Sequence, residues 1–205
     1  MGNQKDKKQQ VVYLHGLQSS GQSTTAQRLR RTLPKHEVIS PDLAVQPDVA
    51  LSQLRKLATT LRPDAIIVGT SMGGFFAQLF RGFNRILINP SFHVSRKLAE
   101  KEGERLPFHN PRLDGLKDFE VNKKLIRKYE QNEAKQWDKK FGIIGKNPDS
   151  DGQVQAFFGT LDEVVNGKPE YLEHYGKFTD FEGGHRLDPN TTITLIVPAI
   201  LELGS

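Results

Sequence analysis

Apolar and polar residues form two different kinds of pattern along this chain. Short apolar runs bounded by turn residues have the length of β-strands, and they cover residues 11–14, 36–40, 65–68, 85–89, 154–158 and 177–181. Longer stretches that predict helices lie between them, over residues 24–33, 47–61, 72–83, 169–175 and 190–203. Strands that alternate with helices in this way form βαβ units. The pattern therefore predicts an α/β fold in which a mostly parallel central sheet is flanked by helices.

One long charged stretch, residues 91–148, interrupts this alternation and is only weakly periodic. Helices are expected within it at residues 94–102 and 119–141. We interpret residues 93–147 as an insertion that forms a helical lid over the sheet. The polar, lysine-rich residues 1–10 predict a disordered tail, which leaves a single domain over residues 11–205. Pro198 is expected to kink the last helix or to mark its first turn.

The composition narrows the class of protein. A length of 205 residues, with 36% hydrophobic and 26% charged residues, is typical of one globular domain. The longest apolar run, residues 195–201, is far shorter than the roughly 20 residues that cross a bilayer. The N-terminus has no apolar stretch that could act as a secretion signal, so we expect a cytoplasmic protein. The absence of cysteine excludes disulfides, thiolate metal sites and a cysteine nucleophile.

The positive charge is concentrated in the insertion. The chain has a formal net charge of +5, and residues 93–147 alone hold 14 basic and 9 acidic residues. No nucleic-acid-binding module accompanies this charge, so a solvated helical face is the favoured interpretation. Attraction of an anionic substrate, such as an acyl-CoA or an acyl phosphate, is the alternative.

The most informative motif lies at residues 69–73, which read Gly-Thr-Ser-Met-Gly and match G-x-S-x-G. In this turn a serine is held in a strained conformation between a strand and a helix, and the glycines avoid collisions between them. The motif here follows the most apolar predicted strand and opens a predicted helix, which is the setting it requires. Ser71 is therefore the candidate nucleophile. The alternative is a turn whose small residues serve packing alone.

A serine hydroxyl becomes nucleophilic when a base removes its proton, so a histidine and an orienting carboxylate are expected downstream. His185 follows two glycines just after the last predicted strand, at the same edge of the sheet as Ser71. Asp162 lies on the loop after an earlier strand, and the chain order Ser, Asp, His matches this architecture. These residues are the candidate base and acid, and the neighbouring Glu163 is the alternative acid.

Acyl transfer also needs donors for the oxyanion that forms at the carbonyl oxygen. The Met72 N–H, at the start of the helix after the nucleophile, is one candidate. The second is expected from the loop after the first strand, at the Leu17 N–H. His15 and Asp42 precede Ser71 in the chain, so we interpret them as residues that order loops and not as catalytic groups.

Five segments carry a family resemblance. They read Tyr-Leu-His-Gly-Leu-Gln-Ser-Ser at residues 13–20, Gly-Thr-Ser-Met-Gly-Gly at 69–74, Ile-Asn-Pro at 88–90, Gly-Thr-Leu-Asp-Glu-Val at 159–164 and Glu-Gly-Gly-His at 182–185. Together they resemble the YqiA-like family of small bacterial esterases within the α/β-hydrolase superfamily, over nearly the whole chain outside the insertion. The resemblance implies an α/β-hydrolase fold and an esterase or thioesterase, with Ser71 as nucleophile, His185 as base and Asp162 as acid.

The sequence predicts neither a metal nor a cofactor, because it lacks an H-E-x-x-H motif and the G-x-G-x-x-G spacing of a phosphate-binding loop. The expected partner is a small-molecule acyl ester or thioester, without nucleic acid or a membrane span, and the oligomeric state stays open. Two alternatives remain. The same residues could transfer an acyl group or cleave a peptide, or the fold and its pocket could serve a non-enzymic binding protein.

Overall fold

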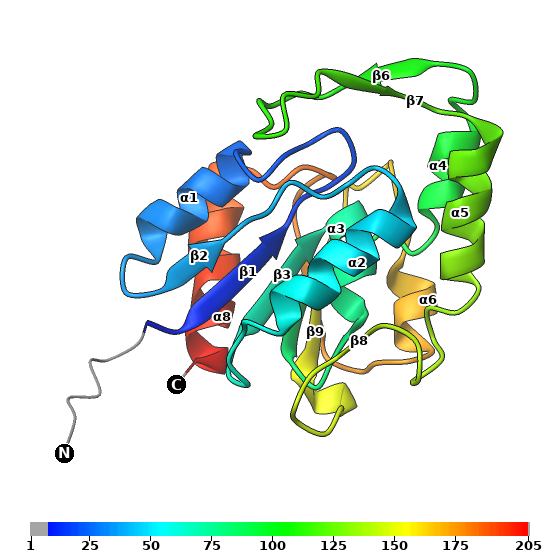
Figure 1. Cartoon of the computed structure of the whole chain (residues 1–205). Coiled ribbons are helices and arrows are strands. Elements are labelled where there is room, and N and C mark those ends of the chain that lie inside the picture. Colours follow the sequence, from blue (N-terminus) through cyan, green and yellow to red (C-terminus); the bar gives the residue numbers. More distant parts are fainter. Residues whose placement is uncertain (1–7, 205) are drawn as a thin grey trace.

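The computed structural model describes residues 8–204 and is built around a six-stranded sheet (Figure 1). All strand pairs in this sheet are parallel, and the strand order is β10-β9-β5-β3-β1-β2. The strands are β1 (Gln10–Leu14), β2 (Glu37–Ile39), β3 (Ile66–Thr70), β5 (Asn84–Ile88), β9 (Val154–Gly159) and β10 (Phe178–Phe181). The predicted tail at residues 1–10 lies outside the described residues up to residue 7, and Gln10 already belongs to β1.

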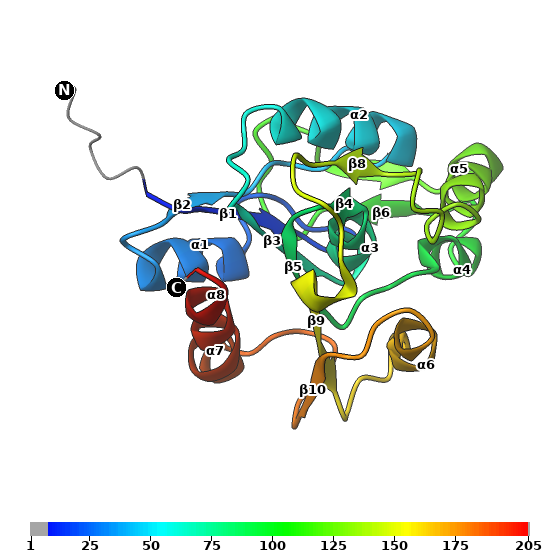
Figure 2. The same ribbon diagram turned by 90° about the horizontal axis from the view of Figure 1, so that it is seen from below.

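Helices cover both faces of the sheet (Figure 2). One face carries α1 (Thr24–Thr32), α7 (Pro189–Thr191) and α8 (Val197–Leu203), and the other carries α2 (Pro47–Ala58) and α3 (Met72–Gln78). Side chains alternate between the faces along each strand, so Val11 and Tyr13 join one buried core, while Val12 and Leu14 join the other. The α/β-hydrolase fold predicted from the sequence is thus the fold observed. No helix within residues 8–204 is long and apolar enough to cross a membrane.

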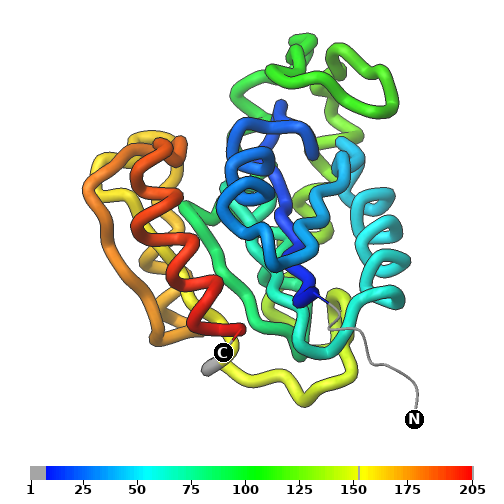
Figure 3. Tube along the Cα trace, turned by 90° about the vertical axis from the view of Figure 1, so that its left-hand side faces the viewer, coloured from blue at the N-terminus to red at the C-terminus, as the bar shows by residue number. Residues whose placement is uncertain are grey.

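The insertion is less helical than the sequence predicts. It contains α4 (Val94–Ala99), the hairpin strands β6 (Arg105–Pro107) and β7 (Asp118–Glu120), α5 (Lys123–Glu133) and β8 (Ile143–Ile144). The hairpin lies above the carboxyl ends of the parallel strands, at the opposite end of the molecule from the start of β1 and the end of α8 (Figure 3). Strands of two or three residues are too short to produce a periodic pattern, which is why the hairpin and β8 were not predicted.

Two predicted helices end differently in the structure. The helix expected over residues 72–83 stops at Gln78, because Phe80 and Arg81 form a short strand, β4, that pairs with β8 of the insertion. At the C-terminal end, a π-helical turn at Thr192–Ile196 precedes α8, and Pro198 lies in the first turn of α8, which is the second of the two expected positions. Proline has no N–H with which to continue the helix, and the wider turn accommodates it.

Two short helical segments flank β9. A 3₁₀ turn at Asp151–Gln153 precedes the strand, and α6 (Lys168–Leu172) follows the loop after it. The loops after β1, β3, β5, β9 and β10 therefore all open at the same edge, because parallel strands present their carboxyl ends together.

The turn between β3 and α3 brings helix and strands into backbone contact. A Cβ atom placed on Gly73 would lie 1.9 Å from the Leu14 carbonyl oxygen, and one on Gly69 would lie 2.1 Å from the Gly73 oxygen. Neither position has room for a side chain. The steric reason inferred from the sequence for the motif glycines therefore agrees with the packing.

We expect Gly73→Ala to lower the free energy of unfolding by about 3 kcal/mol or more, since a backbone shift is needed to relieve the overlap. Gly176→Ala is the matched control, because nothing lies within 4 Å of a Cβ placed there. That variant should stay within about 0.5 kcal/mol of the wild type in urea unfolding. Equal stability of the two variants would contradict the proposed close contact.

Candidate active site

Ser71 occupies the turn between β3 and α3 in a backbone conformation that serine rarely adopts, with φ 56° and ψ −121°. The backbone of neighbouring elements holds this turn. The Ser71 N–H donates to the Ile88 carbonyl oxygen at 3.0 Å, and the Ser71 oxygen accepts from the N–H groups of Gly74 and Ser91 at 2.8 and 3.0 Å. The serine side chain is therefore presented from a rigid position at the carboxyl edge of the sheet.

The structure brings the three side chains of the predicted triad into one chain of hydrogen bonds. His185 Nε2 lies 2.9 Å from Ser71 Oγ, and His185 Nδ1 lies 2.8 Å from Asp162 Oδ2. A carboxylate only accepts, so Nδ1 carries the proton, and the lone pair of Nε2 is left to accept from the serine hydroxyl. This is the geometry in which an imidazole can act as a base toward Ser71.

The second carboxylate oxygen of Asp162 is also hydrogen-bonded. Its Oδ1 accepts from the backbone N–H groups of Val164 and Val165 at 2.8 and 3.0 Å, and its side chain is only 5% exposed. Glu163, the alternative acid, is exposed to solvent. The geometry therefore favours Asp162 over Glu163 as the partner of His185.

Asn89, at the end of β5, connects the loops that carry the acid and the base. Its Nδ2 donates to the carbonyl oxygens of Gly184 and His185 at 3.0 and 3.2 Å, and its Oδ1 accepts from the Gly159 N–H at 2.7 Å. Asn89 is 2% exposed and has φ 42°, a left-handed conformation that asparagine tolerates better than most residues. No pattern in the sequence pointed to a role for Asn89. Its position directly after a buried strand and before a proline was the available signal.

The loop between β1 and α1 passes beside the serine. A Cβ atom placed on Gly16 would lie 3.3 Å from Ser71 Cβ and 3.8 Å from Ser71 Oγ, so this part of the loop faces the serine directly. The Gly16 carbonyl oxygen lies 2.8 Å from His15 Nδ1 and accepts from the Ser19 N–H at 3.2 Å. In a trans peptide, the N–H points away from the preceding carbonyl. Both contacts therefore fix the direction of the Leu17 N–H, on the opposite side of the same peptide unit.

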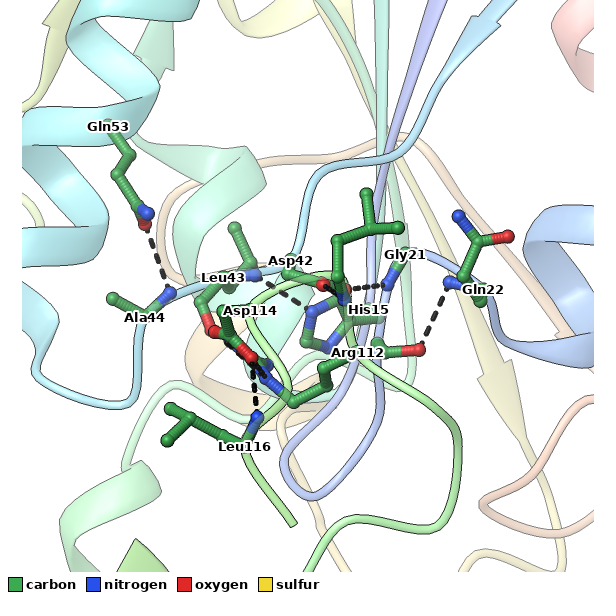
Figure 4. Close-up of polar contacts among 12 residues, drawn as sticks. His15, Gly21, Gln22, Asp42, Leu43, Ala44, Gln53, Arg112, Asp114 and Leu116 are labelled. Carbon is green, nitrogen blue, oxygen red and sulfur yellow. Dashed lines mark hydrogen bonds and ion pairs between the residues drawn. The ribbon is translucent and has the colours of Figure 1, made fainter. Parts of the chain in front are cut away.

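His15 connects this loop to the one after β2. Its Nε2 accepts from the Leu43 N–H at 3.0 Å, which leaves the proton on Nδ1 to donate to Gly16 (Figure 4). Burial lowers the pKa of His15 to about 4, so the imidazole is neutral near pH 7. The structure places His15 among loop contacts, as the sequence analysis expected, and away from the Ser71–His185–Asp162 chain.

Met72, the other predicted donor, is the first residue of α3. Its N–H has no acceptor inside the helix, because the first N–H groups of a helix lack a preceding turn. The N–H groups of Leu17 and Met72 thus belong to the two segments that flank Ser71 Oγ, the β1–α1 loop and the start of α3.

A cleft of about 360 Å³ borders Asp162 and is lined by ten residues, among them Asn89, Phe158, Lys168 and Asp180. Neither Ser71 nor His185 lines this cleft, so of the three triad residues only Asp162 borders it. Among the residues that the structure describes, no group of three or more histidine, aspartate or glutamate side chains has the arrangement of a metal site.

Comparison with known proteins agrees with this architecture. The family profile described as Uncharacterised protein family (UPF0227) matches residues 10–168. Three solved structures illustrate the shared fold. A monoacylglycerol lipase from Paleococcus ferrophilus superposes with a TM-score of 0.63 at 15% identity, over 95% of this chain and 93% of that one.

The second is the S-formylglutathione hydrolase FrmB from Staphylococcus aureus, with a TM-score of 0.60 and 16% identity over 97% of this chain and 85% of the other. The third is Est1E from Butyrivibrio proteoclasticus, with a TM-score of 0.58 and 16% identity over 98% of this chain and 88% of the other. At these identities the likeness establishes the α/β-hydrolase fold alone.

Because His15 is buried, we expect the free energy of unfolding to depend on pH. An unfolded histidine has a pKa of about 6.5, so the contribution of His15 is complete above that pH and is lost as the pH falls toward 4. Between pH 7 and pH 5, the wild type should lose about 2 kcal/mol more unfolding free energy than His15→Gln. Glutamine is the matched substitute because its amide offers a donor and an acceptor but does not titrate. Equal losses in urea unfolding, followed through Trp137 fluorescence, would contradict this role of His15.

Proposed function

We propose that this chain, which belongs to the Uncharacterised protein family (UPF0227), is a serine hydrolase that cleaves carboxylic esters or thioesters through an acyl-enzyme on Ser71. The observation that carries the proposal is the continuous hydrogen-bond path from Asp162 through His185 to a strained Ser71. A surface turn or a ligand-binding pocket needs no such path. The names of two structures with the same fold, a lipase and an S-formylglutathione hydrolase, add support for acyl chemistry.

In the first half of the reaction, Ser71 Oγ attacks the acyl carbon while its proton passes to His185 Nε2. The carbonyl π electrons move to oxygen and form a tetrahedral oxyanion. When the oxyanion collapses, the bond to the alcohol or thiol breaks, and that leaving group takes the proton from His185. In the second half, water donates a proton to the same nitrogen and attacks the acyl carbon, which forms a second tetrahedral oxyanion. When this oxyanion collapses, the bond between the acyl carbon and Ser71 Oγ breaks, Oγ takes the proton back from His185, and the free acid is released.

Asp162 supports both halves by fixing the tautomer and stabilising the imidazolium that forms twice in each cycle. The Leu17 and Met72 N–H groups are the proposed oxyanion donors, because both flank Ser71 and backbone dipoles stabilise the new charge without reorganising. The insertion, residues 93–147, is the proposed lid. A cytoplasmic location stays a prediction from the sequence.

The first test is Ser71→Ala, assayed with p-nitrophenyl esters and acyl-CoA thioesters. We expect kcat to fall by a factor of about 10⁴ to 10⁶ because the nucleophile is lost, while thermal unfolding changes little. The control is Ser52→Ala, which removes an exposed hydroxyl from α2. Failure of a fluorophosphonate probe to label Ser71 in the folded wild type would favour a non-enzymic binding protein, and retained turnover in Ser71→Ala would refute the nucleophile.

The second test distinguishes the two adjacent acids. Asp162→Asn should lower kcat by about 10⁴, because an amide favours the wrong tautomer of His185. Glu163→Gln is the matched neutralisation of an exposed neighbour and should stay within about twofold of the wild type. A larger loss in Glu163→Gln than in Asp162→Asn would show that the acid is wrongly assigned.

A further inference from the structure

The insertion contacts the β1–α1 loop through one short segment, residues 107–114, which we call the arm. The arm begins at Pro107, the last residue of β6, and leads toward β7 at the top of the molecule (Figure 1). Gln18, which directly follows Leu17, is bonded to the arm at two points: its Nε2 donates to the Pro107 oxygen at 3.0 Å, and its own carbonyl oxygen accepts from the His109 N–H at 2.8 Å. The Asn110 side chain adds a 3.3 Å hydrogen bond to Ser19.

Gln18 has φ 60°, a left-handed conformation that a glutamine does not favour. The two bonds to the arm compensate for this backbone preference. Because Gln18 is the next residue after Leu17, its conformation sets where the Leu17 peptide lies. The arm thus restrains the position of the Leu17 N–H through Gln18, and His15 restrains it through the Gly16 carbonyl oxygen.

Asp42 connects the arm to the far end of the same loop. Its Oδ1 accepts from the Gly21 N–H at 2.7 Å, and its Oδ2 accepts from the Leu113 N–H at 2.6 Å. One carboxylate therefore bridges the loop and the arm with two backbone hydrogen bonds. Figure 4 shows Asp42 between Gly21 and the arm.

Arg112, within the arm, anchors the arm to the loop after β2. Its side chain is 2% exposed, its Nη1 donates to the Leu43 oxygen at 3.2 Å, and its guanidinium pairs with Asp114 at 2.6 Å. The Leu43 N–H, on the same residue, donates to His15. The arm, the loop after β2 and the β1–α1 loop form one connected set of contacts around His15 (Figure 4).

We propose that the arm holds the Leu17 N–H in place for the oxyanion, and that Asp42 is the positioning residue that joins the arm to the loop. The reason is physical: an oxyanion donor is effective only when its position is set before the reaction, and a loop without secondary structure does not set it alone. The proposal rests on the proposed function. It makes part of the insertion a component of the site and not only a cover over it.

The test compares Asp42→Asn with Asp118→Asn. An asparagine accepts from only one of the two N–H groups and places its NH₂ against the other, so it breaks the bridge with almost no change in size. Asp118 also belongs to the hairpin, but it pairs with Arg105 inside the hairpin, and within residues 8–204 no hydrogen bond or ion pair joins its side chain to the β1–α1 loop. Asp118→Asn is therefore the matched control.

In Asp42→Asn we expect kcat to fall about 10- to 100-fold, less than the loss of a whole oxyanion donor, with KM within twofold. Inhibition by a trifluoromethyl ketone, whose adduct with Ser71 carries an oxyanion, should weaken by a similar factor. The pH profile should keep its midpoint, because the contacts between His185 and Asp162 are untouched. Asp118→Asn should match the wild type in all three measurements.

Different outcomes separate the two proposals. If the wild type turns over no ester or thioester, or if Ser71→Ala retains its turnover, the proposed function is wrong. If the wild type is active and Asp42→Asn keeps its kcat and inhibitor affinity, the arm does not position the donor. Should Asp42→Asn not fold, Gln18→Asn replaces it: asparagine tolerates the left-handed backbone but is one methylene too short to reach Pro107. It should show the same selective loss of kcat, and an unchanged kcat would overturn the proposal.

Discussion

The whole site depends on how closely α3 approaches β1 and β3. Gly73 lies against the Leu14 carbonyl oxygen, and Gly69 lies against Gly73, so strand and helix meet with only backbone between them. This contact holds Ser71 at φ 56° and keeps its side chain at the carboxyl edge of the sheet. A side chain at either glycine would separate helix from strand and move the serine away from His185. The proposed chemistry therefore begins with a packing constraint.

Parallel strands place the other groups within reach, but they do not align them. The carboxyl ends of β3, β9 and β10 lie at one edge, and the loops that follow them carry Ser71, Asp162 and His185. The alignment comes from hydrogen bonds between loops. Asn89 bonds to the last residue of β9 and to the loop after β10 at once, and Asp162 is fixed by two N–H groups of its own loop. Because these contacts hold the loops on both sides of His185, the imidazole has little freedom to turn away from the serine.

The insertion is attached to the site at more than one place. Beside the arm, the Tyr129 hydroxyl of α5 lies 3.1 Å from the Val45 oxygen and 3.2 Å from the sulfur of Met72, so α5 packs against the start of α3. Three of the four basic side chains of α5, namely Lys123, Lys124 and Arg127, face solvent, as expected from the sequence. By contrast, Arg112, Glu133 and Gln136 of the insertion are buried, and each makes polar contacts inside the protein.

The sequence by itself determined the alternation of strands and helices, the strained turn at Ser71 and the order of the serine, acid and histidine. Each of these features depends only on the spacing of nearby residues or on their order along the chain. It did not distinguish Asp162 from Glu163 by geometry, and it missed the β6–β7 hairpin and the bridging contacts of Asn89 and Asp42. Those depend on pairs of residues tens of positions apart, such as Gly21 with Asp42 and Asp42 with Leu113, whose partnership leaves no periodic trace. Only the tertiary structure decided them, since a hydrogen bond between two loops exists only once the sheet has brought the loops together.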